Sequence, residues 1–194
     1  MISCEIYLFR HAQTQWNLEK RFQGQQDSPL SEMGQLQSKK MAETLEVIDP
    51  EIFVTSTLNR TKETARIALE EWGQKKEIIE MTELKESAFG PWEGMMIDDV
   101  KRDFPDEFKA HRTTPHLFEM KGVERYEDIQ KRGLEGLKKL ARKYSGKRIV
   151  VVTHGLLLLC VLAGIRNIPL RLAREKIAIP DNTEYVRVDW LVDD

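Results

Sequence analysis

Residues 148–163 contain two apolar segments in succession, the first of strand length and the second of helix length. The run Arg148-Ile-Val-Val-Val-Thr153 predicts a strand, and Gly155 to Ala163 predicts a helix that is apolar nearly all round. A strand and a helix without a polar face must both be buried, so this strand needs covering layers on its two sides. The chain therefore has to fold as a layered domain with this strand inside a sheet.

Strands alternate with helices along the rest of the chain. We predict strands at 5–9, 52–55, 77–81 and 184–192, and helices at 31–47, 59–72, 97–104 and 126–144. On helix 31–47 the apolar residues Met33, Leu36, Met41 and Leu45 are expected to face the core. This alternation predicts an α/β fold, a three-layer sandwich with a mostly parallel central sheet and helices on both faces. We expect a single domain over residues 1–194, with a small cap insertion at about 85–122 and turns around Pro105 and Pro115.

The charges of the chain nearly cancel, with 30 Lys and Arg against 32 Asp and Glu and a net charge of −2. No basic field is therefore present to attract nucleic acid or anionic lipid. The longest apolar run, 155–165, is too short to span a bilayer, and residues 1–10 lack the basic start of a signal peptide. Cys4 and Cys160 lie in apolar segments, as expected of reduced thiols in a core. We expect a cytoplasmic protein without nucleic-acid or membrane partners; the sequence does not indicate its oligomeric state.

Two predicted strands end in the same way, the first with Arg10-His11 and the strongest with Thr153-His154-Gly155. The carboxyl ends of parallel strands meet at one edge of the sheet, which is where such folds bind ligands. Strand 52–55 leads to Arg60 at the start of a helix. Arg10 directly follows a buried strand, an unfavourable place for a cation without an anion. Two arginines beside two imidazoles predict a phosphate site, with backbone donors added by the helix starts at Gly155 and near Arg60.

Motifs for metals and nucleotides are missing from the sequence. It contains no G-x-x-x-x-G-K-[ST], G-x-G-x-x-G or H-E-x-x-H pattern and no paired C-x-x-C. His111 and His116 are five residues apart, a poor spacing for one helix face. We therefore expect phosphoryl chemistry without a metal or any other cofactor, in which arginines supply the positive charge.

Residues 10–17, Arg-His-Ala-Gln-Thr-Gln-Trp-Asn, resemble the R-H-G-E-T-x-W-N motif of the histidine phosphatase superfamily, also called the phosphoglycerate mutase-like family. The resemblance continues in order through 21–34, 56–60, Glu86 with 90–94, 153–155 and 179–183, and so covers nearly the whole chain. Ala12 and Gln13 depart from the usual glycine and glutamate. Neither position carries a group that does chemistry, so we expect activity to survive both departures.

The resemblance implies a role for each matching residue. His11 would be the nucleophile that becomes phosphohistidine, and Glu86 would be the proton donor, with Glu83 and Glu93 as rival carboxylates. The remaining catalytic residues would bind the phosphoryl oxygens: Arg10, Arg60 and His154. Those assigned to substrate binding are Asn17, Gln23, Gly24 and the backbone of Gly155. A histidine nucleophile needs one bare ring nitrogen, so the other nitrogen of His11 should donate to a backbone carbonyl.

The expected activity is metal-independent hydrolysis of small phosphomonoesters by a histidine acid-type phosphatase, that is, a phosphoric monoester hydrolase. Two alternatives remain open: a cofactor-dependent phosphoglycerate mutase, and a non-catalytic protein that binds a phospho-ligand on the same fold. Mutases of the family resemble R-F-T-G-W-x-D where this chain has Arg21-Phe-Gln-Gly-Gln-Gln-Asp27. They also carry a longer insertion than the segment between Glu86 and Gly122. Both differences favour the phosphatase.

The sequence does not identify the substrate. One apolar group either lines a mouth for bulky esters or fills the core of the cap: Phe22, Phe89, Trp92, Met95 and Met96. One basic group either meets a second anionic group of the substrate or is solvated: Lys85, Lys101 and Arg102.

Overall fold

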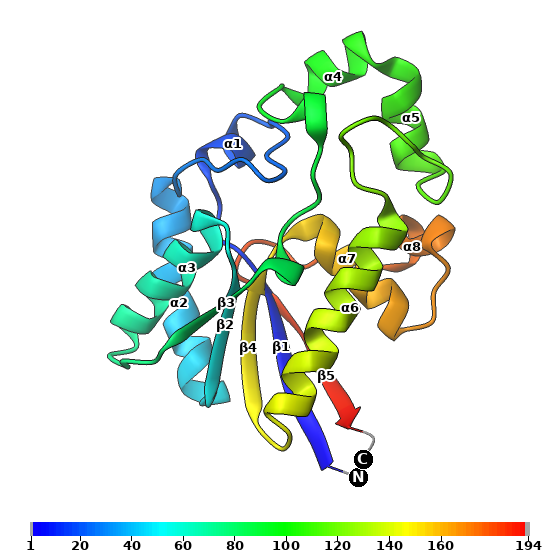
Figure 1. The fold of residues 1–194 in the computed structure, drawn as a ribbon. Coiled ribbons are helices and arrows are strands. Elements are labelled where there is room, and N and C mark those ends of the chain that lie inside the picture. The colour runs from blue at the N-terminus through cyan, green and yellow to red at the C-terminus, as the bar shows by residue number, and fades with distance from the viewer. Residues whose placement is uncertain (1, 193–194) are drawn as a thin grey trace.

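The computed structural model describes residues 2–192, and a five-stranded sheet in the order β3-β2-β4-β1-β5 forms its centre (Figure 1). The strands are β1 (Ile2–Arg10), β2 (Ile52–Ser56), β3 (Ile78–Met81), β4 (Arg148–Thr153) and β5 (Tyr185–Val192). Neighbouring strands are parallel except that β5 runs antiparallel to β1 at the edge. The prediction of a mostly parallel sheet with the apolar strand 148–153 inside it is confirmed.

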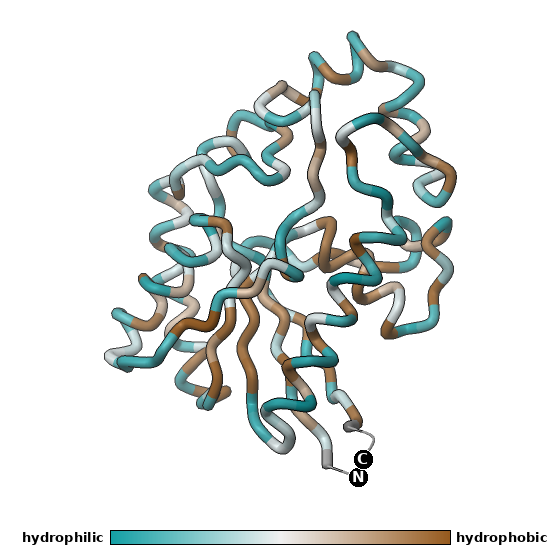
Figure 2. Tube along the Cα trace, in the orientation of Figure 1, coloured by the Kyte–Doolittle hydropathy of each residue, from teal (hydrophilic) through white to brown (hydrophobic). Residues whose placement is uncertain are grey.

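Helices cover both faces of this sheet. One face carries α2 (Glu32–Ile48) and α3 (Asn59–Glu71), and the other carries α6 (Tyr126–Lys143) and α7 (Gly155–Ile165). Side chains of β1 alternate between the two cores, with Ile6 and Leu8 on the α6–α7 side and Tyr7 and Phe9 on the α2–α3 side. In Figure 2 the strands are predominantly hydrophobic, and hydrophilic residues recur along the covering helices. The predicted three-layer sandwich is therefore confirmed.

The buried face of α2 differs from the predicted one. Met41 and Leu45 are buried, but Met33 and Leu36 are 54% and 60% exposed, so the prediction for these two is wrong. In the first turns of α2 the buried residues are instead the small Gly34 and Ser38. A Cβ added to Gly34 would lie only 2.0 Å from the carbonyl oxygen of Gln13. This close approach turns the neighbouring large side chains towards solvent.

Short helices lie beyond the carboxyl ends of the parallel strands: α1 (Gln15–Leu18), α4 (Ile97–Asp103), α5 (Pro105–Thr113) and α8 (Leu170–Lys176), with 3₁₀ turns at Thr82–Leu84 and Gly90–Trp92. The helix near 97–104 was predicted, whereas α1, α5 and α8 were not. Pro105 begins α5 instead of forming a turn, because the missing N–H of proline has no helical partner to lose at that position. Trp92 is completely buried and stacks on Phe118, so it belongs to the core.

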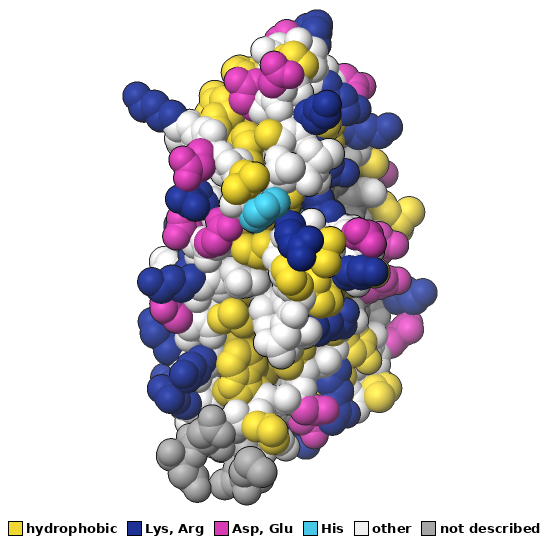
Figure 3. Space-filling model, turned by 90° about the vertical axis from the view of Figure 1, so that its right-hand side faces the viewer, with side chains coloured by type: hydrophobic (Ala, Val, Ile, Leu, Met, Phe, Trp, Pro, Cys, Tyr) yellow, Lys and Arg dark blue, Asp and Glu magenta, His cyan; other side chains and the backbone are white. Residues whose placement is uncertain are grey.

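Helix α7 is the apolar helix predicted from residues 155–163, and every residue from Leu156 to Ala163 is buried. Cys160 is among them, and Cys4 is buried in β1. Within residues 2–192, no single helix has both the length and the hydropathy to cross a membrane; the α7–α8 pair, bent by 109°, meets these criteria only when taken together. On the face in Figure 3, basic and acidic side chains are interspersed.

Candidate active site

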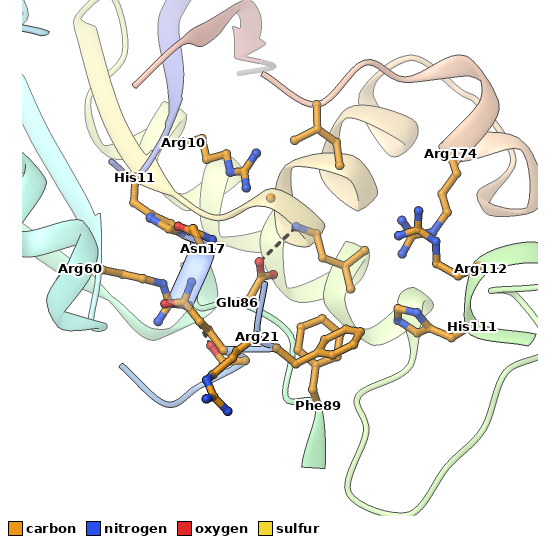
Figure 4. A pocket seen from close by; sticks show the side chains of 16 residues that line it. Arg10, His11, Asn17, Arg21, Arg60, Glu86, Phe89, His111, Arg112 and Arg174 are labelled. Atoms are coloured by element: carbon orange, nitrogen blue, oxygen red, sulfur yellow. Dashed lines mark hydrogen bonds between the residues drawn. The ribbon is translucent and has the colours of Figure 1, made fainter. Parts of the chain in front are cut away.

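A cavity of about 220 Å³ lies at the carboxyl ends of the parallel strands (Figure 4). Eight of the nine residues proposed from the sequence line it: Arg10, His11, Asn17, Gln23, Gly24, Arg60, Glu86 and Gly155. The ninth, His154, is completely buried, with its ring centroid 5.3 Å from that of His11. Two members of the apolar group, Phe22 and Phe89, also line the cavity, as the mouth interpretation of that group expects. The remaining lining residues had been assigned no role: Arg21, His111, Arg112, Leu156, Arg174 and Ile179.

The register of the sheet brings the two histidines together. In the parallel pair of β1 and β4, Arg10 lies opposite Thr153, so the following residues, His11 and His154, leave the sheet side by side. The backbone N–H of His11 continues the ladder by donating to the carbonyl of Thr153 at 2.9 Å. Their proximity is therefore fixed by backbone pairing.

The tautomer of His11 is determined by its hydrogen bond. Nδ1 lies 2.7 Å from the carbonyl oxygen of Ala12. A carbonyl can only accept, so Nδ1 carries the proton and Nε2 bears the lone pair. Burial, reinforced by Arg60 and Arg10, lowers the pKa of His11 well below its usual 6.5, which keeps the ring neutral. Asn182 donates to the His11 carbonyl at 2.6 Å and so holds the backbone here; sequence reasoning gave Asn182 no such role.

His154 is held from behind the cavity. Its Nε2 lies 2.7 Å from the hydroxyl of Ser56, and the oxygen of that hydroxyl accepts from the N–H of Leu58. Burial, reinforced by Arg60 and His11, lowers the pKa of His154 well below its usual value. Its Nδ1 is buried and has no hydrogen-bond partner among the residues that the structure describes. The neutral ring behind His11 thus keeps one buried polar atom without a protein partner in the described chain.

Arg60 is the second residue of α3 and is only 1% exposed. Its guanidinium donates to the carbonyls of Gln26 and Gly24, each at 2.8 Å, and to the carboxylate of Asp27 at 2.9 Å. Burial lowers the pKa of Arg60 and the nearby Glu86 and Asp27 oppose this, so the side chain stays a cation. The early loop therefore positions Arg60 inside the cavity wall.

Arg10 and Asn17 complete the polar wall on the side of His11. Arg10 donates to the carbonyl of Pro180 at 3.4 Å, and its buried Nε has no partner within the described part of the chain. The side-chain oxygen of Asn17 accepts from the backbone and hydroxyl of Thr14 at 3.0 and 3.1 Å. This assignment leaves the amide NH₂ of Asn17 as a donor for the cavity.

Glu86 is the single carboxylate among the described residues that line the cavity. It is 9% exposed and lies at the start of α7, where its two oxygens accept from the backbone N–H groups of Leu156 and Leu157, each at 3.2 Å. The N–H of Ser87 donates to it at 2.9 Å. These contacts fix the orientation of the Glu86 carboxyl group in the cavity wall. Glu86 is the residue expected to donate the proton.

The rival carboxylates lie elsewhere. Glu83 pairs with Lys139 at 2.7 Å, and this contact lowers its pKa. Glu93 accepts from the backbone N–H groups of Gln25 and Phe89. A Cβ on Gly24, whose φ is +57°, would lie 2.1 Å from the Glu93 carboxylate, so the glycine leaves room for that structural contact.

Several backbone donors predicted to bind phosphate are already engaged within the protein. At the start of α3, Asp27 accepts from the N–H groups of Asn59 and Arg60 at 2.9 and 3.4 Å. At the start of α7, Glu86 takes those of Leu156 and Leu157. The helix starts therefore offer fewer free donors than predicted, and guanidinium groups supply more of the positive lining.

Arg132 of α6 fixes the backbone around Glu86. Its guanidinium donates to the carbonyls of Glu83, Lys85 and Glu86 at 2.8, 2.7 and 3.2 Å. Glu124 holds Arg132 through contacts of 2.7 and 2.9 Å. Sequence reasoning missed Arg132 because, on an amphipathic helix, it has the pattern of a solvated cation.

A second basic group lies at the other end of the cavity and consists of His111, Arg112 and Arg174 (Figure 4). None of the basic residues suggested for a second anionic group lines the cavity, and Lys101 and Arg102 pair with Asp98 and Asp99 on their own helix. Of the two alternatives left open for this basic group, the structure therefore favours solvated charge for Lys101 and Arg102. The residues that could serve the purpose come from α5 and α8, neither of which was predicted.

The two departures from the family motif are accommodated without touching the cavity lining. Ala12 is completely buried and its N–H donates to the hydroxyl of Thr64 at 3.0 Å. The side chain of Gln13 accepts from the hydroxyl of Ser31 at 2.8 Å, at the start of α2.

Among the described residues, no group of three or more His, Cys, Asp or Glu is arranged to hold a metal ion.

Comparison with known proteins supports the expected family. The model of the histidine phosphatase superfamily (branch 1) matches residues 6–193. The chain is 29% identical to "Uncharacterized phosphatase PhoE" of Bacillus subtilis (strain 168) over 97% of its length and 92% of that protein. It is 30% identical to "Probable phosphoglycerate mutase GpmB" of Enterobacter sp. (strain 638), over 96% and 87%. The solved structure of Bacillus stearothermophilus YhfR aligns with a TM-score of 0.90 at 32% identity, over 95% and 90%.

Proposed function

Because this chain belongs to the histidine phosphatase superfamily (branch 1), we propose that it hydrolyses phosphomonoesters without a metal ion, through a phosphohistidine formed on His11. The observation that carries this proposal is the 2.7 Å hydrogen bond from Nδ1 of His11 to the Ala12 carbonyl. It leaves Nε2 unprotonated in a neutral ring that lines the same cavity as Arg10 and Arg60. A bare imidazole nitrogen among fixed cations is suited to attack a phosphoryl group.

In the first step, the lone pair of His11 Nε2 attacks phosphorus and the bond from phosphorus to the ester oxygen breaks. Glu86, in its protonated form, gives its proton to the departing oxygen, so the product leaves as a neutral alcohol. Arg10 and Arg60 stabilise the charge on the equatorial phosphoryl oxygens. Nδ1 of His154 and the amide of Asn17 are the further polar atoms available to those oxygens.

In the second step, water attacks phosphorus and gives a proton to the Glu86 carboxylate. The bond between phosphorus and Nε2 breaks, its electron pair returns to the His11 ring, and inorganic phosphate leaves. Glu86 is then protonated and His11 is neutral, as at the start of the cycle. The same carboxyl group thus acts first as acid and then as base.

The proposal is tested with p-nitrophenyl phosphate as substrate in the presence of EDTA, for the wild type and for His11→Ala. We expect full activity in EDTA for the wild type and an acid-labile phosphoenzyme that His11→Ala cannot form. His116→Ala is the matched control, since His116 is outside the cavity lining. Activity that is lost in EDTA and restored by Mg²⁺ would contradict the proposal. Conversion of 3-phosphoglycerate to 2-phosphoglycerate without release of phosphate would support the mutase instead.

A further inference from the structure

Two arginines meet in the cavity without an acidic partner. Arg112 comes from α5 and Arg174 from α8, and Figure 4 shows both at the end of the cavity away from His11. Among the described residues neither forms an ion pair, and the same holds for Arg10 at the phosphoryl end, whereas Arg21 and Arg60 pair with Glu19 and Asp27. The positive charge at this end is therefore not neutralised by the protein.

Tyr126, the first residue of α6, holds this group in place. Its hydroxyl accepts from the guanidinium of Arg174 and lies 3.3 Å from the carbonyl and 3.4 Å from Nε2 of His111. The Arg174 guanidinium also lies 5.6 Å from the centre of the Tyr126 ring. Burial raises the pKa of Tyr126 to about 12, so the tyrosine orients Arg174 without supplying a negative charge.

Polar atoms at this end lack protein partners. His111 is 2% exposed, and its Nδ1 is buried without a hydrogen-bond partner in the described chain, as is Nε of Arg174. Burial, with Arg174 and Arg112 nearby, lowers the pKa of His111 to about 3, so the ring is a neutral polar group. Burial and Arg174 also lower the pKa of Arg112. Two like charges that line one end of a cavity repel each other, and a bound anion would relieve the repulsion.

We propose that Arg112 and Arg174, together with His111, bind a second anionic group on the alcohol part of the substrate. The preferred substrates are then phosphomonoesters whose alcohol carries a carboxylate or a second phosphate. The phosphoryl group lies among Arg10, His11 and Arg60, and the alcohol extends past Glu86 and Phe89, which lie between the two basic groups in Figure 4. This inference rests on the proposed function, because it names the substrate class of the same reaction.

Matched substrate pairs test the proposal. For the carboxylate, the pair is 3-phosphoglycerate and glycerol 3-phosphate; for the second phosphate, it is fructose 1,6-bisphosphate and fructose 6-phosphate. We expect kcat/KM to favour the anion-bearing member of at least one pair by about 10- to 100-fold, as for one or two charge-assisted hydrogen bonds. The pair that shows the preference identifies the anionic group. No preference in either pair would overturn the proposal.

Arginine variants show whether this end of the cavity produces the preference. Arg174→Gln and Arg112→Gln should each lower kcat/KM for the preferred substrate by at least about tenfold and leave p-nitrophenyl phosphate within about twofold. Arg171→Gln is the matched control, because Arg171 is exposed on the same helix, α8, outside this cavity. Arg174→Lys keeps a cation and should recover part of the preference. A preference that persists in both Gln variants would overturn the proposal.

The outcomes separate this inference from the proposed function. Wild-type hydrolysis of p-nitrophenyl phosphate that depends on His11, combined with equal losses for all substrates in the arginine variants, contradicts only the inference. Hydrolysis that survives His11→Ala contradicts the proposed function itself. Melting temperatures of the variants identify any loss that comes from unfolding, since Arg174 contacts the buried Tyr126. In that case Arg112→Gln, at an exposed residue, decides the question.

Discussion

Asp27 contacts Arg60 twice, through the side chain and through the backbone. Its carboxylate lies 2.9 Å from Nη1 of the Arg60 guanidinium and also accepts from the N–H groups of Asn59 and Arg60 at the start of α3. One carboxylate therefore fixes both the helix and the cation that this helix carries into the cavity. The two contacts can be separated by substitution.

Asp27→Asn keeps an oxygen that can cap α3 but removes the negative charge beside Arg60. We expect the melting temperature to change little, while kcat/KM for p-nitrophenyl phosphate falls about tenfold as Arg60 loses its charged partner. Asp27→Ala should lower both, with about 1 kcal/mol lost from the free energy of unfolding. Asp98→Asn, an exposed residue paired with Lys101, is the control. Equal melting temperatures for the Asn and Ala variants would contradict the capping role.

Glu86→Gln tests the proton donor. Loss of a general acid lowers the rate by about 10²- to 10⁴-fold when the leaving group needs a proton. An alkyl phosphate should therefore suffer this loss, whereas p-nitrophenyl phosphate should be affected much less, since nitrophenolate leaves without a proton. The measurement is kcat for the two substrates, with Glu83→Gln and Glu93→Gln as controls. An equal loss on both substrates in Glu86→Gln would indicate a structural role only.

The two histidines should differ in labelling. His11→Ala should abolish turnover and the acid-labile phosphoenzyme, because Nε2 is the attacking atom. His154→Ala should slow both formation and breakdown of the phosphoenzyme but still allow labelling, since it removes a neutral group beside the phosphoryl site. Rapid-quench measurements of bound phosphate distinguish the two. Labelling that survives in His11→Ala and disappears in His154→Ala would reverse the assignment.

Arg132 is expected to position Glu86 from outside the cavity. Arg132→Lys retains the positive charge but not the fork that reaches three carbonyl groups. We predict that kcat for an alkyl phosphate falls about tenfold with KM unchanged, and that p-nitrophenyl phosphate is less affected. Arg66→Lys, at an exposed pair with Glu70, provides the control. A rise in KM without a change in kcat would show that Arg132 acts on binding instead.

Stability should fall in acid because of three buried imidazoles. The pKa of His111 is about 3, and those of His11 and His154 are lowered well below 6.5, mainly through burial. Below about pH 6.5 the unfolded state binds protons that the folded state does not, so each ring removes up to about 1.4 kcal/mol of unfolding free energy per pH unit. Above that pH their effect is constant. Denaturant titrations between pH 7 and 5 measure the slope, which His111→Gln should reduce.

An unchanged slope in His111→Gln would contradict the assignment of a neutral His111.

The phosphoryl end of the site was predictable because its residues follow strand ends. His11 and His154 each come directly after an apolar strand, so the pattern of the sequence places them at one edge of the sheet. Arg60 follows the same rule through β2 and α3. For these three residues, the local sequence pattern and the sheet topology both indicate a position at the carboxyl edge of the sheet.

The other end of the cavity was not predictable from local patterns. Arg112 and Arg174 lie on short helices that sequence reasoning missed, and each has the pattern of an ordinary surface arginine. They are brought together by Tyr126, through contacts that join α5, α6 and α8. The outward side chains of Met33 and Leu36 have a similar origin, since the approach of Gly34 to the Gln13 carbonyl overrides the apolar pattern of α2.

Because β1 pairs with β4, the relative position of His11 and His154 can change only in steps of one residue. A sheet can shift its pairing only by whole residues, and a single-residue shift would turn each side chain of the moved strand to the opposite face. An insertion or deletion within β1 therefore cannot adjust the two imidazoles gradually, because it would also turn Tyr7 and Phe9 towards the wrong helix layer. A register shift that separated the two rings would therefore also disrupt the packing of the hydrophobic core, so the adjacency of His11 and His154 is coupled to folding.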